Sequence, residues 1–69
     1  MYGIGDKIIF YNAVGMELFG AITGIRYHEP PITYEVFCLG ESFLVKQEHI
    51  IKKISAEEYK RLLPKMSFE

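Results

Sequence analysis

The chain has 69 residues, a net charge of −1 and 49% hydrophobic residues, which is typical of one small folded domain rather than a disordered chain. Its single cysteine, Cys38, excludes an internal disulfide, and Cys38, His28 and His49 lack the spacing of a metal-binding cluster. No apolar run approaches the ~20 residues of a membrane span, and the first residues have no signal-peptide pattern. We therefore expect a cytoplasmic protein with no cofactor or metal.

Glycines and the pair Pro30-Pro31 divide the first 54 residues into short segments, as expected for antiparallel strands joined by turns. Gly20 and Gly24 interrupt the second segment, and two glycines inside one strand indicate a strongly coiled strand. Phe10, in the first segment, is assigned to the core. The sequence predicts strands at residues 7–11, 17–27, 32–39, 42–46 and 50–53, with a helical turn at 47–49.

Alternation of apolar and polar residues is clearest in the third predicted strand. Phe37 and Leu39 are the large apolar residues on one of its faces. We assign the opposite face to the core, and it carries Ile32, Tyr34, Val36 and Cys38. We expect the preceding turn at 28–31 and the following tight turn at Gly40-Glu41.

A short C-terminal helix carries the strongest local signals. Ser55 and Glu58 form a capping box, and Ile54 and Tyr59 are placed to form a hydrophobic staple. Pro64 is expected to end this helix, which gives a helix over residues 56–63 and a loose tail at 65–69.

A helix of this length is unstable alone in water, so it must pack on the sheet. Its apolar face carries Tyr59, Leu62 and Leu63. Phe37 and Leu39, on the outer face of the third strand, are the expected docking partners.

Four segments resemble those of small SH3-like barrels of the Tudor-like and KOW-like kind. Gly5-Asp6-Lys7-Ile8-Ile9 resembles their opening strand, Gly20-Ala21-Ile22-Thr23-Gly24-Ile25 their second strand, and Tyr34-Glu35-Val36 their third. Val45, Ile50, Ile51 and Ile54 around a one-turn helix resemble the end of such barrels. The resemblance covers residues 4–54. It implies a mainly β fold, a five-stranded antiparallel SH3-like barrel with a short C-terminal helix, in one domain.

Such barrels bind peptides, methylated side chains or nucleic acids, or serve as subunits of larger enzymes, so the resemblance does not choose among these roles. Surface aromatic residues are the first binding candidates, because rings can stack on bases, grip proline-rich peptides or hold methylated cations. The candidates are Tyr11, Phe19, Tyr27 and Phe37. The alternative is that these rings fill the core, pack under the helix or form a contact between copies of the chain.

The C-terminal third is basic, with a net charge of +2 over residues 46–69 against −3 over residues 1–45. A basic surface can meet phosphate or an acidic partner, and the alternative is an ordinary solvated surface. The candidates for a basic patch are Lys46, Lys52, Lys53, Lys60 and Arg61.

Catalysis is not expected, because no nucleophile and base are placed together and Cys38 falls on a predicted core face. Two hypotheses remain. The first is a non-catalytic protein-interaction module or a subunit of a larger assembly. The second is a nucleic-acid-binding barrel, against which the net charge of −1 counts. The sequence leaves open whether the chain forms a homo-oligomer.

Overall fold

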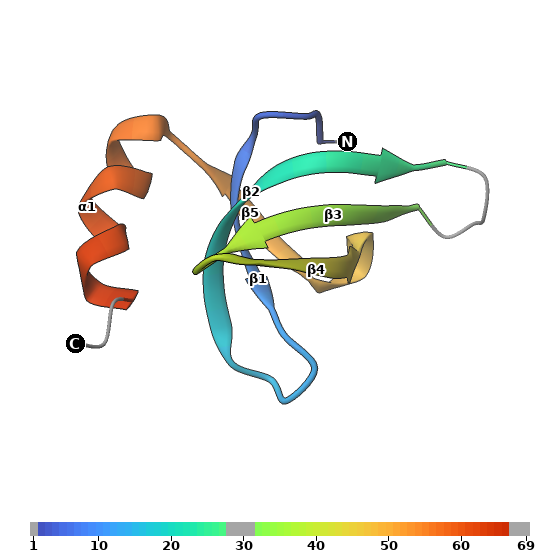
Figure 1. Ribbon diagram of the computed structural model, residues 1–69, viewed down its shortest axis with the longest axis horizontal. Helices are drawn as coiled ribbons and strands as arrows, with labels where there is room; N and C mark the ends of the chain where they lie inside the picture. Colours follow the sequence, from blue (N-terminus) through green and yellow to red (C-terminus); the bar gives the residue numbers. More distant parts are fainter. Residues whose placement is uncertain (1, 28–31, 67–69) are drawn as a thin grey trace.

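The alternating strand patterns and the capping box build five antiparallel strands followed by one helix (Figure 1). The structure is a computed structural model, and it describes residues 2–27 and 32–66. No helix within these residues is long and apolar enough to cross a membrane. The elements are β1 (Lys7–Tyr11), β2 (Glu17–Arg26), β3 (Thr33–Cys38), β4 (Glu41–Lys46), the 3₁₀ turn η1 (Gln47–His49), β5 (Ile50–Ile54) and α1 (Ala56–Met66).

The sheet has the order β4-β3-β2-β1-β5, and β2 connects its two halves. The first half of β2 pairs with β1 and its second half with β3, so that Ala21 lies opposite both Lys7 and Phe37. The β2–β3 register shifts between Ile22 and Gly24. Figure 1 shows the curvature of β2 at this point, and because of it the sheet bends over one central core.

The core lies between the two halves of the sheet and contains side chains from every strand. The predicted core residues Phe10, Tyr34, Val36 and Cys38 are buried there, whereas Ile32 is only partly buried. The buried cluster is Ile8, Phe10, Ile22, Tyr34, Val36, Cys38, Val45 and Ile50.

The hydroxyl group of Tyr34 is the polar atom that enters this core. It donates a hydrogen bond to Oε1 of Gln47 at 3.2 Å and accepts one from the backbone N–H of Tyr2 at 3.4 Å. The ring of Tyr2 packs edge-on against that of Tyr34, with the ring centroids 5.8 Å apart. Tyr34, the largest buried side chain, is therefore held both by packing of its ring in the core and by hydrogen bonds to its hydroxyl group.

The helix covers a second apolar layer on the outer face of the β1–β2 half. Ile9 and Ile54 point away from the main core and are nevertheless 8% and 5% exposed. On the same face, Nζ of Lys7 lies 5.7 Å from the centre of the Tyr59 ring, and α1 contacts β2. The main contact of α1 is with β2. Phe37 and Leu39, the expected docking partners, keep about half of their surface exposed, and their contact with α1 stays a prediction.

The N-terminal cap of α1 is confirmed, but its predicted end is not. The backbone N–H of Glu58 donates to Oγ of Ser55 at 3.0 Å. The helix continues through Pro64 to Met66 rather than ending at residue 63. Proline removes one backbone donor but keeps a helical φ angle, so the last turn can include it. Of the predicted loose tail 65–69, residues 67–69 lie outside the described residues, as does the predicted turn at 28–31.

The predicted turn at Gly40-Glu41 lies one residue earlier, at Leu39-Gly40. Both residues have positive φ angles, 53° and 83°, and Cys38 pairs with Glu41 across them. This is the geometry of a two-residue type I′ hairpin, which fits the right-handed twist of the strands. Glu41 therefore belongs to β4, and β4 is one residue longer than predicted.

The mainly β class, the five antiparallel strands and the C-terminal helix are confirmed. The strand boundaries differ from the predicted ones by no more than one residue at each end. The edge strands of the sheet are β4 and β5, and no pairing joins them among the described residues. Closure of the sheet into an SH3-like barrel therefore stays a prediction.

Candidate functional site

A groove of about 300 Å³ opens where the β1–β2 loop faces β4 and η1. Its aromatic lining residues are Tyr11, which is exposed, Phe43, which is half-buried, and Phe10, which has no exposed surface. The ring centroids of Phe10 and Phe43 lie 6.2 Å apart, at an interplanar angle of 51°. Val14 is 77% exposed at the rim, and Leu44, whose side chain lies on the face of β4 opposite to Phe43 and Val45, is 60% exposed. The whole lining is Phe10, Tyr11, Asn12, Ala13, Val14, Phe43, Leu44, Val45, Lys46 and His49.

The loop wall of the groove is braced by Asn12. Oδ1 of Asn12 accepts hydrogen bonds from the backbone N–H groups of Val14, at 3.0 Å, and Met16, at 2.9 Å. The backbone N–H of Asn12 donates to the carbonyl oxygen of Met16, and its carbonyl accepts from Gly15. Gly15 has a φ angle of +86°, which a residue with a Cβ rarely adopts. The loop is therefore held in one shape by its own sequence.

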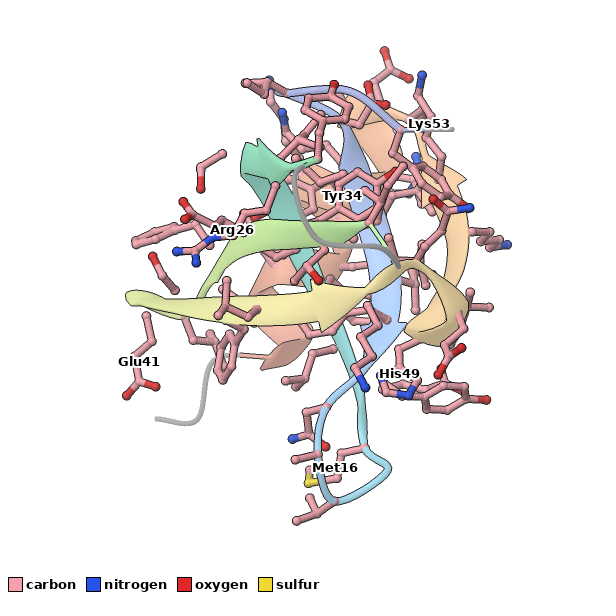
Figure 2. All side chains as sticks on the ribbon, turned by 90° about the vertical axis from the view of Figure 1, so that its right-hand side faces the viewer. Met16, Arg26, Tyr34, Glu41, His49 and Lys53 are labelled. Atoms are coloured by element: carbon pink, nitrogen blue, oxygen red, sulfur yellow. The ribbon has the colours of Figure 1, made fainter. Side chains whose placement is uncertain are left out.

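The opposite wall is the C-terminal half of β4 together with η1. Lys46 ends β4 in an extended conformation, and η1 then turns the chain so that His49 also lines the groove. Figure 2 shows His49 between β4 and the hairpin that carries Met16. Nε2 of His49 lies 3.9 Å from Oε2 of Glu48, and Lys46 has no ion pair within the described part of the chain. The groove thus has an apolar centre and a cationic end.

The four aromatic residues predicted to bind a partner do not come together. Tyr11 lines the groove and is 44% exposed. Phe19 is half-buried, packs against the core and lies opposite Ile9 on the face covered by the helix. Tyr27, just beyond the end of β2, and Phe37, on the outer face of β3, are exposed but do not line the groove.

The predicted basic residues are also spread over several elements. Lys46 lies at the groove, Lys52 and Lys53 lie on the edge strand β5, and Lys60 and Arg61 lie on α1. Nζ of Lys53 lies 3.4 Å from Oδ1 of Asp6, so part of its charge is already neutralised.

Sequence reasoning missed most of the groove, because its two walls lie about thirty residues apart in the chain. Asn12, Val14, Phe43, Leu44 and His49 had not been connected with one another. Two local signals were nevertheless present. Val14 is an aliphatic residue in a predicted loop, and Phe43-Leu44-Val45 is apolar on both faces of a short strand.

Among the described residues, the thiol of Cys38 is buried in the core. Burial raises the pKa of the Cys38 thiol, although a hydrogen bond from the Phe19 backbone opposes this rise. A buried thiol with a raised pKa stays protonated and behaves as a small apolar group. No three His, Cys, Asp or Glu side chains within the described ranges gather in a way that would hold a metal ion.

Comparisons of the chain with protein families, with curated proteins and with solved structures find no match.

Proposed function

We propose that this chain is a non-catalytic protein-interaction module, acting as an adaptor or as a subunit of a larger assembly, and that the groove is its ligand site. The observation that carries the proposal is the combination of an aromatic floor with exposed aliphatic residues at the rim. Val14 and Leu44 remain largely in water although the domain has a well-packed core. Apolar side chains that stay exposed around a concave site are typical of binding surfaces.

The construction of the loop wall supports this proposal. Because Asn12 and Gly15 fix the loop through local hydrogen bonds, little conformational entropy is lost when a ligand binds against it. Phe43 packs against the core, of which the fully buried Phe10 is a part. Aromatic side chains in such positions supply much contact area for few rotatable bonds.

A nucleic-acid-binding barrel remains the alternative. It requires cations arranged along one path, because phosphate contacts supply most of the affinity. Lys46, Lys53 and Arg61 lie on three different elements, and Lys53 is paired with Asp6. The net charge of −1 adds no general attraction. These observations favour the protein-interaction module.

The test is a selection of random peptides of about ten residues, a length that exceeds the run of a typical strand. The immobilised protein is compared with Val14→Asp at the groove rim. The matched control is Ile4→Asp, since Ile4 is an aliphatic residue in a turn, is 69% exposed and does not line the groove. Enriched peptides should bind the Val14→Asp protein about tenfold more weakly and the control unchanged. Equal binding to both variants would remove the groove as the site.

A second arm tests the alternative directly. Labelled single- and double-stranded DNA and RNA are titrated with the protein at low and at physiological salt, with fluorescence anisotropy as the readout. Binding that falls steeply with salt and is lost in a Lys52→Glu/Lys53→Glu variant would replace the proposal by nucleic-acid binding. We expect no such binding.

A further inference from the structure

The alternation of backbone hydrogen bonds in the β3–β4 hairpin shows which backbone groups of β4 point away from β3. Cys38 and Glu41 flank a two-residue turn, so they form a hydrogen-bonded pair, and bonded pairs then recur at every second residue. The hydrogen bond from the N–H of Gln47 to the carbonyl of Ile32, at 3.3 Å, fits this alternation, because the two residues are the next pair expected to be hydrogen-bonded.

It follows that Phe43 and Val45 direct their backbone groups toward β3. The backbone groups of Ser42 and Leu44 and the N–H of Lys46 point the other way, and no backbone hydrogen bond reaches them from the described ranges. The carbonyl of Lys46 is not part of this free edge, because Lys46 is the N-cap of η1 and its carbonyl accepts the first hydrogen bond of that turn. Leu44 and Lys46 are also groove-lining residues. One wall of the groove is therefore an unpaired strand edge.

The two edges of the sheet differ in a way that singles out β4. On β5, Lys52 and Lys53 occupy the middle of the strand, and the β1–β5 register shifts between Ile9 and Phe10. Lysines and bulges are the features by which proteins keep an edge from pairing with another chain. β4 keeps an unbroken register with β3, contains no proline and has its only lysine at its end.

We propose that the ligand of this groove is an extended peptide that adds to β4 as a further strand and places a carboxylate beside Lys46, an inference that rests on the proposed function. The backbone of the peptide would pair with Leu44 and with the N–H of Lys46, and every second side chain would enter the apolar centre beside Phe43. The cationic end of the groove, where Lys46 lies, is complementary to an acidic residue or a chain terminus.

A second copy of the chain fits this edge less well than a single peptide. Both views show the β1–β2 loop extending past the level of β4 (Figures 1 and 2), and Figure 2 labels Met16 in this loop. The loop and the end of β4 line the same narrow groove. A lone extended segment can enter between them, whereas a strand that brings its own sheet would meet the loop.

Amide hydrogen exchange, measured by NMR on the full chain, tests this strand addition. The probe is a peptide enriched in the selection described above. In the free protein the N–H groups of Leu44 and Lys46 should exchange quickly. With the peptide bound, both should slow by about tenfold or more, while Phe43 and Val45, already bonded to β3, should change little. A peptide that binds without slowing Leu44 and Lys46 would overturn strand addition and leave the proposed function standing.

The charge at the end of the groove is tested by exchanging charges. Lys46→Glu should weaken binding of an acidic peptide by about fivefold, and the same peptide with lysine in place of its acid should recover the loss. If the lysine-containing peptide does not recover the lost binding, the proposal that a carboxylate of the ligand lies beside Lys46 is overturned. Protection of Leu44 and Lys46 that rises with protein concentration alone would mean that a second copy occupies the edge. If no peptide is enriched, the proposed function itself fails.

Discussion

Adding a single methyl group at Gly20 should destabilise the whole domain, because β2 and β3 approach each other closely there. A Cβ atom at Gly20 would lie 2.5 Å from Cγ1 of Val36, 2.8 Å from the carbonyl oxygen of Phe37 and 3.3 Å from Cβ of Cys38. Val36 and Cys38 are buried, and the Phe37 oxygen belongs to the backbone. Neither strand can move away without disturbing the core between the two halves of the sheet.

Overpacking a core typically costs about 1–3 kcal/mol. Replacing glycine by alanine gains about 0.4–1 kcal/mol, because the unfolded chain loses freedom. For Gly20→Ala we therefore expect a net loss of about 1–2 kcal/mol in the free energy of unfolding. A domain of 69 residues typically has about 3–10 kcal/mol in total, so the melting temperature should fall by about 10 °C.

The assay is urea unfolding followed by circular dichroism, with Gly24→Ala as the control in the same strand. A Cβ at Gly24 would meet only side-chain atoms of Glu35, the nearest at 2.8 Å. That side chain can swing away at the cost of its exposed ion pair with Arg26, which is worth about 1 kcal/mol at most. The reasoning is refuted if Gly20→Ala unfolds at the same urea concentration as the unchanged protein, or if Gly24→Ala is the less stable variant.

A double-mutant cycle locates the cause of the loss. Val36→Ala removes the Cγ1 atom that a methyl group at residue 20 would strike, although the carbonyl oxygen of Phe37 remains close. The cost of Gly20→Ala should therefore shrink by about 1 kcal/mol in the Val36→Ala background. Strictly additive costs would mean that the destabilisation arises elsewhere.

Four further changes test individual parts of the fold, each by urea or thermal unfolding. Leu39→Asn should raise stability by about 0.5–1 kcal/mol, because asparagine tolerates the φ angle of +53° better than leucine; a loss would show that the Leu39 side chain contributes packing. Ser55→Ala should cost about 1 kcal/mol, since the N–H of Glu58 loses its acceptor, and Ser55→Asp should retain most of the stability. Truncation after Ser55 should sharply lower the melting temperature, because the second apolar layer loses its cover; an unchanged melt would show that the helix does not pack on the sheet. A hydrogen bond from the Gly3 N–H lowers the pKa of Asp6 in the folded protein. The ionised carboxylate therefore stabilises the fold at pH values above the ordinary aspartate pKa, and this stabilisation is lost as the pH falls through the folded-state pKa. Asp6→Asn should therefore be less stable than the unchanged protein at pH 7, with the difference shrinking below about pH 4; a constant difference would contradict this role.

The strands and the helix start could be predicted because each depends on nearby residues. The alternation around Tyr34 and Val36 reports which side of β3 is buried, and both residues are fully buried. The capping box of Ser55 and Glu58 needs only one helical turn to form. In each case the signal and its physical cause lie within a few residues.

The errors concern features that depend on distant parts of the chain. Leu39 adopts a left-handed conformation that leucine disfavours, because strand pairing on both sides requires the turn to lie there. Phe19 was a candidate for a surface binding ring, but it lies opposite Ile9 on the face that the helix covers, which agrees with the alternative of packing under the helix. Local patterns contain no information about where a C-terminal helix will cross the sheet.

The position of the helix also explains why the groove forms at β4 rather than elsewhere. The core takes the inward side chains of both halves of the sheet, and α1 covers the outer face of the β1–β2 half, where Ile9 and Ile54 are buried. No comparable element covers the β3–β4 half within the described residues, so Phe37 and Leu44 stay exposed. The bend of β2 then brings the end of β4 opposite the β1–β2 loop. Because α1 is the one α-helix in the described part of the chain, the half of the sheet that it leaves uncovered is where an apolar partner can still bury area, and the unpaired edge of β4 lies within that half.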